Sequence, residues 1–212
     1  MTGLLRSDSI VCHAGHLPSP PRRTDSMGMP LVRRSFTVGE YHRMAEAGIL
    51  GEDDRVELID GQVVAMTPIG PDHGSCVNRL TALFAPLAGR QATVSVQNPV
   101  VLGEHQEPQP DLTVLRYRAD GYRERHPEAS DVLLVIEVGD TSFEADRRTK
   151  IPLYSRTGIP EAWLVNLPAD TIECYREPTS EGYADIRTVQ RGETLTPVRL
   201  PGITLRVDAI LG

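Results

Sequence analysis

The sequence predicts an α/β (α+β) fold, because helix and strand patterns follow one another along a single chain. Residues 131–138 are almost wholly apolar and rich in β-branched side chains, which is typical of a strand buried on both faces. Residues 71–89 carry apolar side chains at steps of three and four, which indicates an amphipathic helix. Residues 171–175 and 184–190 are expected to form a C-terminal β meander.

The chain divides into a tail and one domain. Residues 1–35 are rich in Pro, Ser, Arg and His and lack apolar periodicity, so we expect a disordered N-terminal tail. Residues 36–212 are long enough for a single domain with a sizeable core. Cys12, His13 and His16 could ligate a metal, but an isolated trio in such a tail is more often without function.

Composition excludes several classes of protein. The three cysteines are few and widely spaced, which argues against a disulfide framework and fits a reducing, cytoplasmic location. No apolar run is long enough to cross a membrane, and we expect no membrane partner and no organic cofactor. The net charge of −7 argues against strong nonspecific binding of polyanions, although a local basic groove could still bind nucleic acid.

The domain is expected to begin with a helix and a hairpin. Thr37 is suited to the N-cap of the helix, Glu40 completes a capping box, and Gly48 follows the last helical residue. Two alternating runs then flank Asp60-Gly61, a strong signal for a type I′ turn. The two expected strands are residues 55–59 and 62–66.

The middle of the chain is expected to continue with the helix at 71–89, whose last turn contains Pro86. Short strands are expected at 93–96 and 99–102, and Asp111 begins the next one. A loop rich in arginine follows that strand. Such clusters are mostly solvated surface, but this loop could contact phosphate. Its basic residues are Arg116, Arg118, Arg123, Arg125 and His126.

After the buried strand, Thr141-Ser142 can cap a helix. Pro152 cannot lie unstrained deep within a helix, so either a new helix begins near Ile151 or one helix is kinked. Residues 161–166 have the pattern of another buried strand.

The buried strand carries an unexpected carboxylate, Glu137. An unpaired buried carboxylate is costly, so Glu137 should pair, protonate or hold a metal. With Asp111 on a neighbouring strand and a basic run after it, the pattern suggests metal-assisted phosphodiester chemistry. Alternatives remain for each acid: Asp111 could cap a turn, and Glu137 could form a salt bridge with Arg147 or Arg148.

These residues together resemble a known family, the Uma-type putative restriction endonucleases of the PD-(D/E)XK nuclease superfamily. The resemblance extends over about residues 35–205 and rests on an ordered series of motifs, each weak by itself. The motifs are Phe36-Thr37-Val38 with Glu40-Tyr41, Val56 to Gly61, His73 with Leu80, Gln109-Pro110-Asp111, Ile136-Glu137-Val138, Asp146 with Lys150 and Tyr154, and Gly158 to Val165.

The resemblance implies a restriction-endonuclease-like core, with a mixed central β-sheet flanked by helices. It implies that Asp111, Glu137 and the backbone carbonyl of Val138 bind a metal, with Glu57 as an additional acid. The sequence departs from the superfamily at Gly139, where a lysine is usual. Lys150 could replace that lysine if its segment folds back over the strand ends, although taken alone it resembles a solvated helix lysine.

The expected chemistry is Mg²⁺-dependent hydrolysis of DNA, with Mn²⁺ as a possible substitute. Gln109 could position the substrate or a metal-bound water, and His73 could contact phosphate or cap its helix. A homodimer is expected because duplex DNA has two-fold symmetry. The alternative is a catalytically inactive nuclease fold that binds nucleic acid or another protein.

Overall fold

The computed structural model describes residues 33–51, 53–88 and 91–212. Residues 34–212 form one compact unit. The predicted tail lies almost entirely outside the described residues, and so does the possible Cys12, His13 and His16 site. Within the described part of the chain, no helix combines the length and apolar character of a membrane span.

A six-stranded sheet with the order β3-β4-β5-β6-β7-β8 forms the centre of this unit. All neighbouring strands are antiparallel except β5 and β6, which run parallel, so the sheet is mixed as expected. The strands are β3 (Ala92–Val96), β4 (Leu112–Arg116), β5 (Val132–Gly139), β6 (Glu161–Asn166), β7 (Thr171–Thr179) and β8 (Gly182–Gln190).

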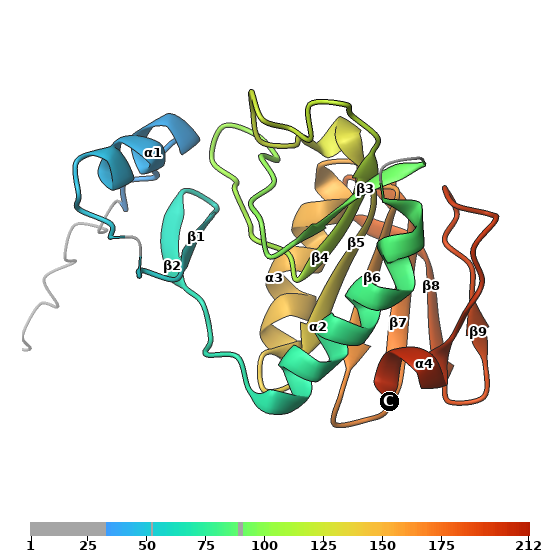
Figure 1. Ribbon diagram of the computed structural model, residues 1–212. Helices are drawn as coiled ribbons and strands as arrows, with labels where there is room; N and C mark the ends of the chain where they lie inside the picture. The colour runs from blue at the N-terminus through green and yellow to red at the C-terminus, as the bar shows by residue number, and fades with distance from the viewer. Residues whose placement is uncertain (1–32, 52, 89–90) are drawn as a thin grey trace, which may run out of the picture. The chain divides into compact units, whose positions relative to one another are not determined.

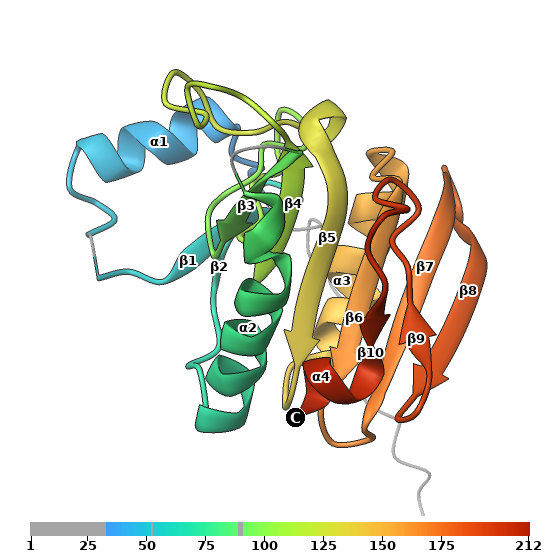
Figure 2. The same ribbon diagram turned by 45° about the vertical axis from the view of Figure 1, so that its right-hand side comes forward.

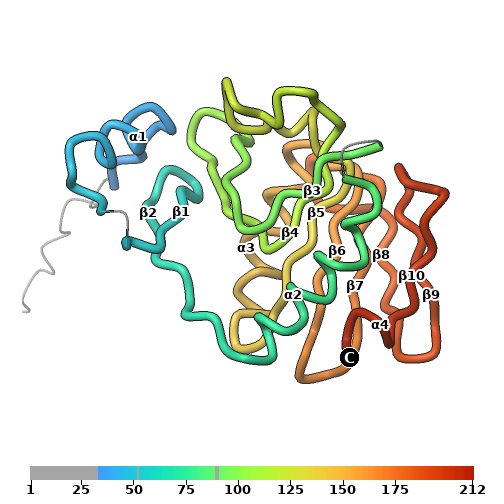
Figure 3. Tube along the Cα trace, viewed as in Figure 1, coloured from blue at the N-terminus to red at the C-terminus, as the bar shows by residue number. Residues whose placement is uncertain are grey.

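Helices cover both faces of this sheet (Figure 1 and Figure 2). The helices α2 (Pro71–Phe84) and α4 (Val207–Leu211) lie on one face, and α3 (Phe143–Arg156) lies on the other; the Cα trace in Figure 3 follows the same path. Each face has its own apolar core. On β5, Ile136 and Val138 pack in the α2 core, whereas Val135 packs in the α3 core. Glu137 alternates with Ile136 and Val138, so it lies on the α3 face.

The smaller elements lie before, between and after the strands of the sheet. They are α1 (Val38–Glu46), β1 (Val56–Ile59), β2 (Gln62–Ala65), the 3₁₀ turns at Ala85–Leu87 and Ala129–Asp131, β9 (Thr194–Leu195) and β10 (Leu205–Arg206). The capping box of Thr37 and Glu40 is present in α1. Asp60 and Gly61 both have positive φ, 49° and 70°, as a type I′ turn requires. The helix and the hairpin predicted from local signals are therefore confirmed.

Two local expectations need correction. Residues 99–102 form no regular strand, because Val100 and Leu102 donate their backbone N–H groups to Pro108 and Gln106 within the same loop. The helix predicted at 71–89 ends at Phe84 and passes into a 3₁₀ turn that contains Pro86.

The helix α3 runs through Pro152 without a break, so no new helix begins near Ile151. The residues on either side of the proline, Ile151 and Leu153, are buried in the core between α3 and the sheet. This packing stabilises the helix at the point where the proline removes a backbone donor.

Candidate active site

The pairing of β4 with β5 brings Asp111 next to Glu137. Leu112 pairs with Ile136, and one step further along this antiparallel register Asp111 lies opposite Glu137. The backbone N–H of Val138 donates a 2.9 Å hydrogen bond to Asp111 Oδ2. The two acids predicted from sequence therefore lie at the same end of adjacent strands.

Asp111 is held as an ionised carboxylate by several donors. His73 Nε2 lies 3.0 Å from Asp111 Oδ2, and Gln97 Nε2 donates to Oδ1 at 3.2 Å. Burial opposes ionisation, but the His73 hydrogen bond and charge, with the Val138 amide, lower the pKa of Asp111. The same hydrogen bond raises the pKa of His73. His73 lies in the first turn of α2, beside Asp111. Its predicted contact with phosphate stays a prediction.

Glu137 is only 2% exposed and sits in different surroundings. The hydroxyl of Tyr154 donates a short hydrogen bond to Glu137 Oε1, and Lys150 Nζ lies 3.4 Å from the same oxygen. Burial raises the pKa of Glu137 well above its ordinary value; the charge of Lys150 opposes this shift, and the nearby carboxylates add to it. A second cation would therefore stabilise the ionised form.

Lys150 reaches this site from α3, which does fold back over the strand. Its Nζ lies 3.2 Å from Glu57 Oε2, 3.4 Å from Glu137 Oε1 and 3.9 Å from Asp146 Oδ1. Burial disfavours the charged amine, but these three carboxylates outweigh burial and raise the pKa of Lys150. Lys150 is therefore a buried ammonium ion and not a solvated helix lysine.

Packing explains why no lysine follows Glu137 at position 139. A Cβ atom built on Gly139 would lie 2.7 Å from the backbone Cα of Phe143, at the start of α3. Any side chain at this position would push the helix away from the strand. The start of α3 packs closely against β5 at Gly139, and this packing both excludes a lysine at position 139 and places Lys150 near Glu137.

Glu57 enters the site from β1. Its Oε2 accepts the backbone N–H of Gln109 at 3.1 Å in addition to the contact with Lys150. The side chain of Gln109 donates to the Val56 carbonyl at 3.4 Å, so here it joins β1 to the segment before Asp111. Its predicted role toward substrate or water stays a prediction.

One pocket connects these groups. Glu57, His73, Gln109, Asp111, Glu137, Val138, Asp146 and Lys150 all line it, together with the exposed Arg55. The carboxylates of Glu57, Asp111 and Glu137 do not gather as tightly as the sequence suggested, because as a trio they do not all lie within 4.8 Å of one another. Lys150 lies between Glu57 and Glu137, and His73 holds Asp111.

The donor set of this pocket suits a hard divalent cation. The carboxylates of Glu57, Glu137 and Asp146 share the single ammonium group of Lys150, and Asp111 beside them is paired with His73. Burial raises the pKa of Asp146 as well as that of Glu137; Lys150 opposes both shifts, and the neighbouring carboxylates add to them. Oxygen ligands and excess negative charge are the surroundings that Mg²⁺ and Mn²⁺ prefer.

Sequence reasoning gave no role to three residues that complete this site: Asp146, Tyr154 and Gln97. Asp146, Lys150 and Tyr154 are spaced by four residues and lie on one face of α3. This spacing in the sequence could have indicated Asp146 and Tyr154. No sequence pattern indicates Gln97, because it follows β3 and comes close to Asp111 only when the sheet has formed.

The arginine loop does not join this pocket. Arg118 pairs with Asp120, and Arg125 pairs with Asp131. None of its basic residues lines the pocket of Asp111 and Glu137. Its predicted contact with phosphate remains a prediction.

Comparisons with known proteins identify the fold and the family. A crystal structure described as a putative nuclease belonging to DUF820, from Anabaena variabilis, superposes with a TM-score of 0.61 at 19% identity. The match covers 83% of this chain and 97% of that chain, and it shows a shared fold. No curated protein matches the sequence. The model of the Uma2 family, described as "Putative restriction endonuclease", matches residues 38–208, and the chain therefore belongs to this family.

Proposed function

We propose that the protein is a Mg²⁺-dependent DNA endonuclease that hydrolyses phosphodiester bonds, with Mn²⁺ as a possible substitute. The observation that carries this proposal is the excess of carboxylates around the buried Lys150, in a pocket that also contains Asp111. Such an arrangement costs folding free energy, and a purely structural role would be served better by one acid for each base.

Asp111, Glu137, Glu57 and the carbonyl of Val138 would hold the cation. When bound, Mg²⁺ supplies Lewis acidity, which lowers the pKa of a water and offsets charge on phosphate oxygens. His73 and the Val138 amide keep Asp111 ionised and fix its orientation. The hydroxyl of Tyr154 donates a hydrogen bond to Glu137 Oε1 and fixes the orientation of this carboxylate.

Lys150 would offset negative charge as the scissile phosphate gains it in the transition state. Its raised pKa keeps it protonated at neutral pH, which suits an electrostatic role better than that of a general base. Arg55 lines the same pocket and could contact a flanking phosphate, and Gln109 could position the attacking water or the substrate.

The test is cleavage of supercoiled plasmid, linear duplex DNA, single-stranded DNA and RNA with Mg²⁺, Mn²⁺ or EDTA. We expect metal-dependent cutting of DNA that falls by about 100-fold or more in Asp111→Asn and Glu137→Gln. Glu144→Gln is a matched control, because Glu144 is an exposed carboxylate on the same helix. If pure, folded protein cuts no substrate with either metal, the enzyme proposal fails and the inactive binding module is favoured.

The proposal includes a homodimer, since two-fold symmetric DNA suits a two-fold protein. Light scattering coupled to gel filtration should then give twice the chain mass of 23.3 kDa. A monomer at the concentration used for cleavage would contradict this part of the proposal and leave the chemistry untouched.

A further inference from the structure

We propose that His42, Glu107 and His126 form a second metal site, which takes a divalent transition ion such as Zn²⁺. One ligand atom from each side chain lies within 4.8 Å of the other two. Within the described part of the chain, this is the only group of three His, Cys, Asp or Glu residues that meets this distance. None of the three lines the pocket of Asp111 and Glu137.

The donor types select the class of ion. Two imidazoles and one carboxylate are the protein ligands of many three-ligand zinc sites, in which water completes the coordination. Imidazole nitrogen favours Zn²⁺ and its neighbours among the transition metals, whereas Mg²⁺ favours carboxylate and water oxygens. The two proposed sites therefore differ in the metal that each should bind.

Glu107 provides an independent reason to expect a cation. Its side chain is only 4% exposed, and burying a carboxylate requires a compensating positive charge. Among the described residues its one ion-pair partner is His42, whose Nε2 lies 2.7 Å from Glu107 Oε2. No lysine or arginine of that part of the chain lies within ion-pair distance of it.

An ion could reach this cluster from solvent. The His42 side chain is 41% exposed, and His126 is exposed. Both rings line one open pocket, and their centroids lie 5.8 Å apart. A metal bound there could be exchanged and chelated without unfolding the protein.

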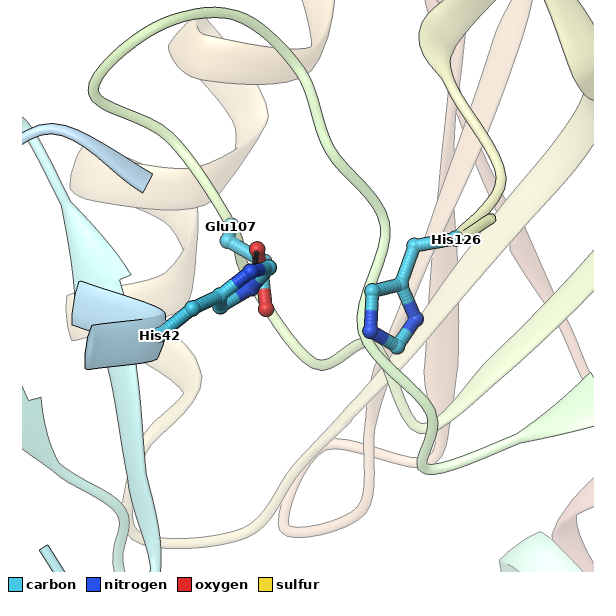
Figure 4. Close-up of side chains that lie close together, drawn as sticks. All are labelled: His42, Glu107 and His126. Atoms are coloured by element: carbon cyan, nitrogen blue, oxygen red, sulfur yellow. Dashed lines mark hydrogen bonds and ion pairs between the residues drawn. The ribbon is translucent and has the colours of Figure 1, made fainter. Parts of the chain in front are cut away.

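The three ligands come from three separate segments, as Figure 4 shows: His42 from α1, and Glu107 and His126 from two loops. Glu107 exchanges both backbone hydrogen bonds with Leu58 of β1. Glu57, next to Leu58, and Gln109, two residues after Glu107, line the pocket of the proposed active site. A bound ion would therefore connect α1, through His42, and the arginine loop, through His126, to the segment that pairs with β1.

Calorimetric titration of the full chain with Zn²⁺, in excess Mg²⁺ to occupy the carboxylate pocket, tests this proposal. We expect one Zn²⁺ per chain, and a loss of affinity of about 100-fold or more in both His42→Gln and His126→Gln. Saturating Zn²⁺ should raise Tm by about 5 °C in the wild type and leave it unchanged in His126→Gln. His126 is exposed, so its replacement should not prevent folding.

The matched control is the triple variant Cys12→Ser, His13→Gln, His16→Gln, which should bind Zn²⁺ like the wild type. The proposal is overturned if no Zn²⁺ binds, or if binding is lost in this control or in Glu137→Gln. Unchanged affinity in His126→Gln would also overturn it and leave His42 and Glu107 as a simple ion pair. None of these outcomes depends on nuclease activity, so the two proposals can fail separately.

Discussion

Two buried carboxylates on neighbouring strands, Glu137 on β5 and Glu161 on β6, have opposite surroundings. Glu161 is fully buried on the α2 face, where it accepts hydrogen bonds from Trp163 Nε1 at 2.8 Å, Arg176 Nε at 2.9 Å and the Val198 amide at 2.6 Å. One acid there meets one arginine. Around Glu137, three carboxylates share one lysine beside an open pocket.

The difference shows that burial of a carboxylate is not by itself a sign of function. Glu161 is as buried as Glu137, but its charge and its hydrogen-bonding capacity are satisfied within the fold. What distinguishes Glu137 is a deficit of positive charge next to solvent-accessible space. The comparison predicts that Glu161 acts in stability and Glu137 in activity.

The largest expected effect on stability is that of Glu161→Gln. This change leaves the guanidinium of Arg176 without its counter-charge, and we expect the free energy of unfolding to fall by about 3 kcal/mol. Glu137→Gln should lower it by less than about 1 kcal/mol, because burial already opposes the ionised form and Lys150 keeps Glu57 and Asp146. Urea denaturation measures both, and equal losses would contradict the comparison.

Removal of the shared cation should make stability depend on pH. In Lys150→Met the three carboxylates around Nζ lose their cation, and we expect a loss of about 2 kcal/mol at pH 8. Glu137 and Asp146 have pKa values raised in the folded state, so their protonated forms favour folding. Their contribution is greatest below the unfolded values of 4.5 and 3.8 and declines as pH rises through the folded values.

The Lys150→Met variant should therefore recover part of its stability as the pH is lowered from 8 to 5. Denaturation curves across this range give the free energy of unfolding at each pH. Arg148→Met is a matched control, because Arg148 is an exposed cation on the same helix with a side chain that is 80% exposed. A control with the same recovery would show that the effect is not specific to the buried cluster.

Local signals in the sequence were enough for much of the fold. The capping box at Thr37, the Asp60-Gly61 turn and the apolar runs of β5 and β6 all lie where they were predicted. Residues 99–102 were predicted wrongly, because an apolar run gives no sign that it will pair within its own loop. Continuity of α3 through Pro152 depends on packing against the sheet, which local propensity does not contain.

The site was predictable to the extent that its residues lie on predicted elements. Asp111 and Glu137 follow from strand patterns, whereas the equally buried Glu161 gave no sign of its different role. Its partners Arg176 and Val198 are distant in sequence, and only the fold brings them to it. The cluster of His42, Glu107 and His126 could not be predicted for the same reason.

The smallest expected effect concerns the hydroxyl of Tyr154, which either orients Glu137 for activity or contributes only to stability. Tyr154→Phe removes the hydroxyl that donates to Glu137, and Tyr183→Phe is a matched control that removes a hydroxyl donating to the Ile159 carbonyl at 2.9 Å. Both tyrosines are buried, and each change should lower the free energy of unfolding by about 1 kcal/mol.

Cleavage should fall by about tenfold in Tyr154→Phe alone, because only this hydroxyl orients a proposed metal ligand. Plasmid nicking at saturating Mg²⁺, compared with nicking at limiting Mg²⁺, distinguishes weaker metal binding from slower chemistry. If the two variants lose stability and activity equally, Tyr154 contributes only packing. Glu137 would then be positioned by Lys150 alone, and its surroundings would resemble those of Glu161 more closely than the charge balance indicates.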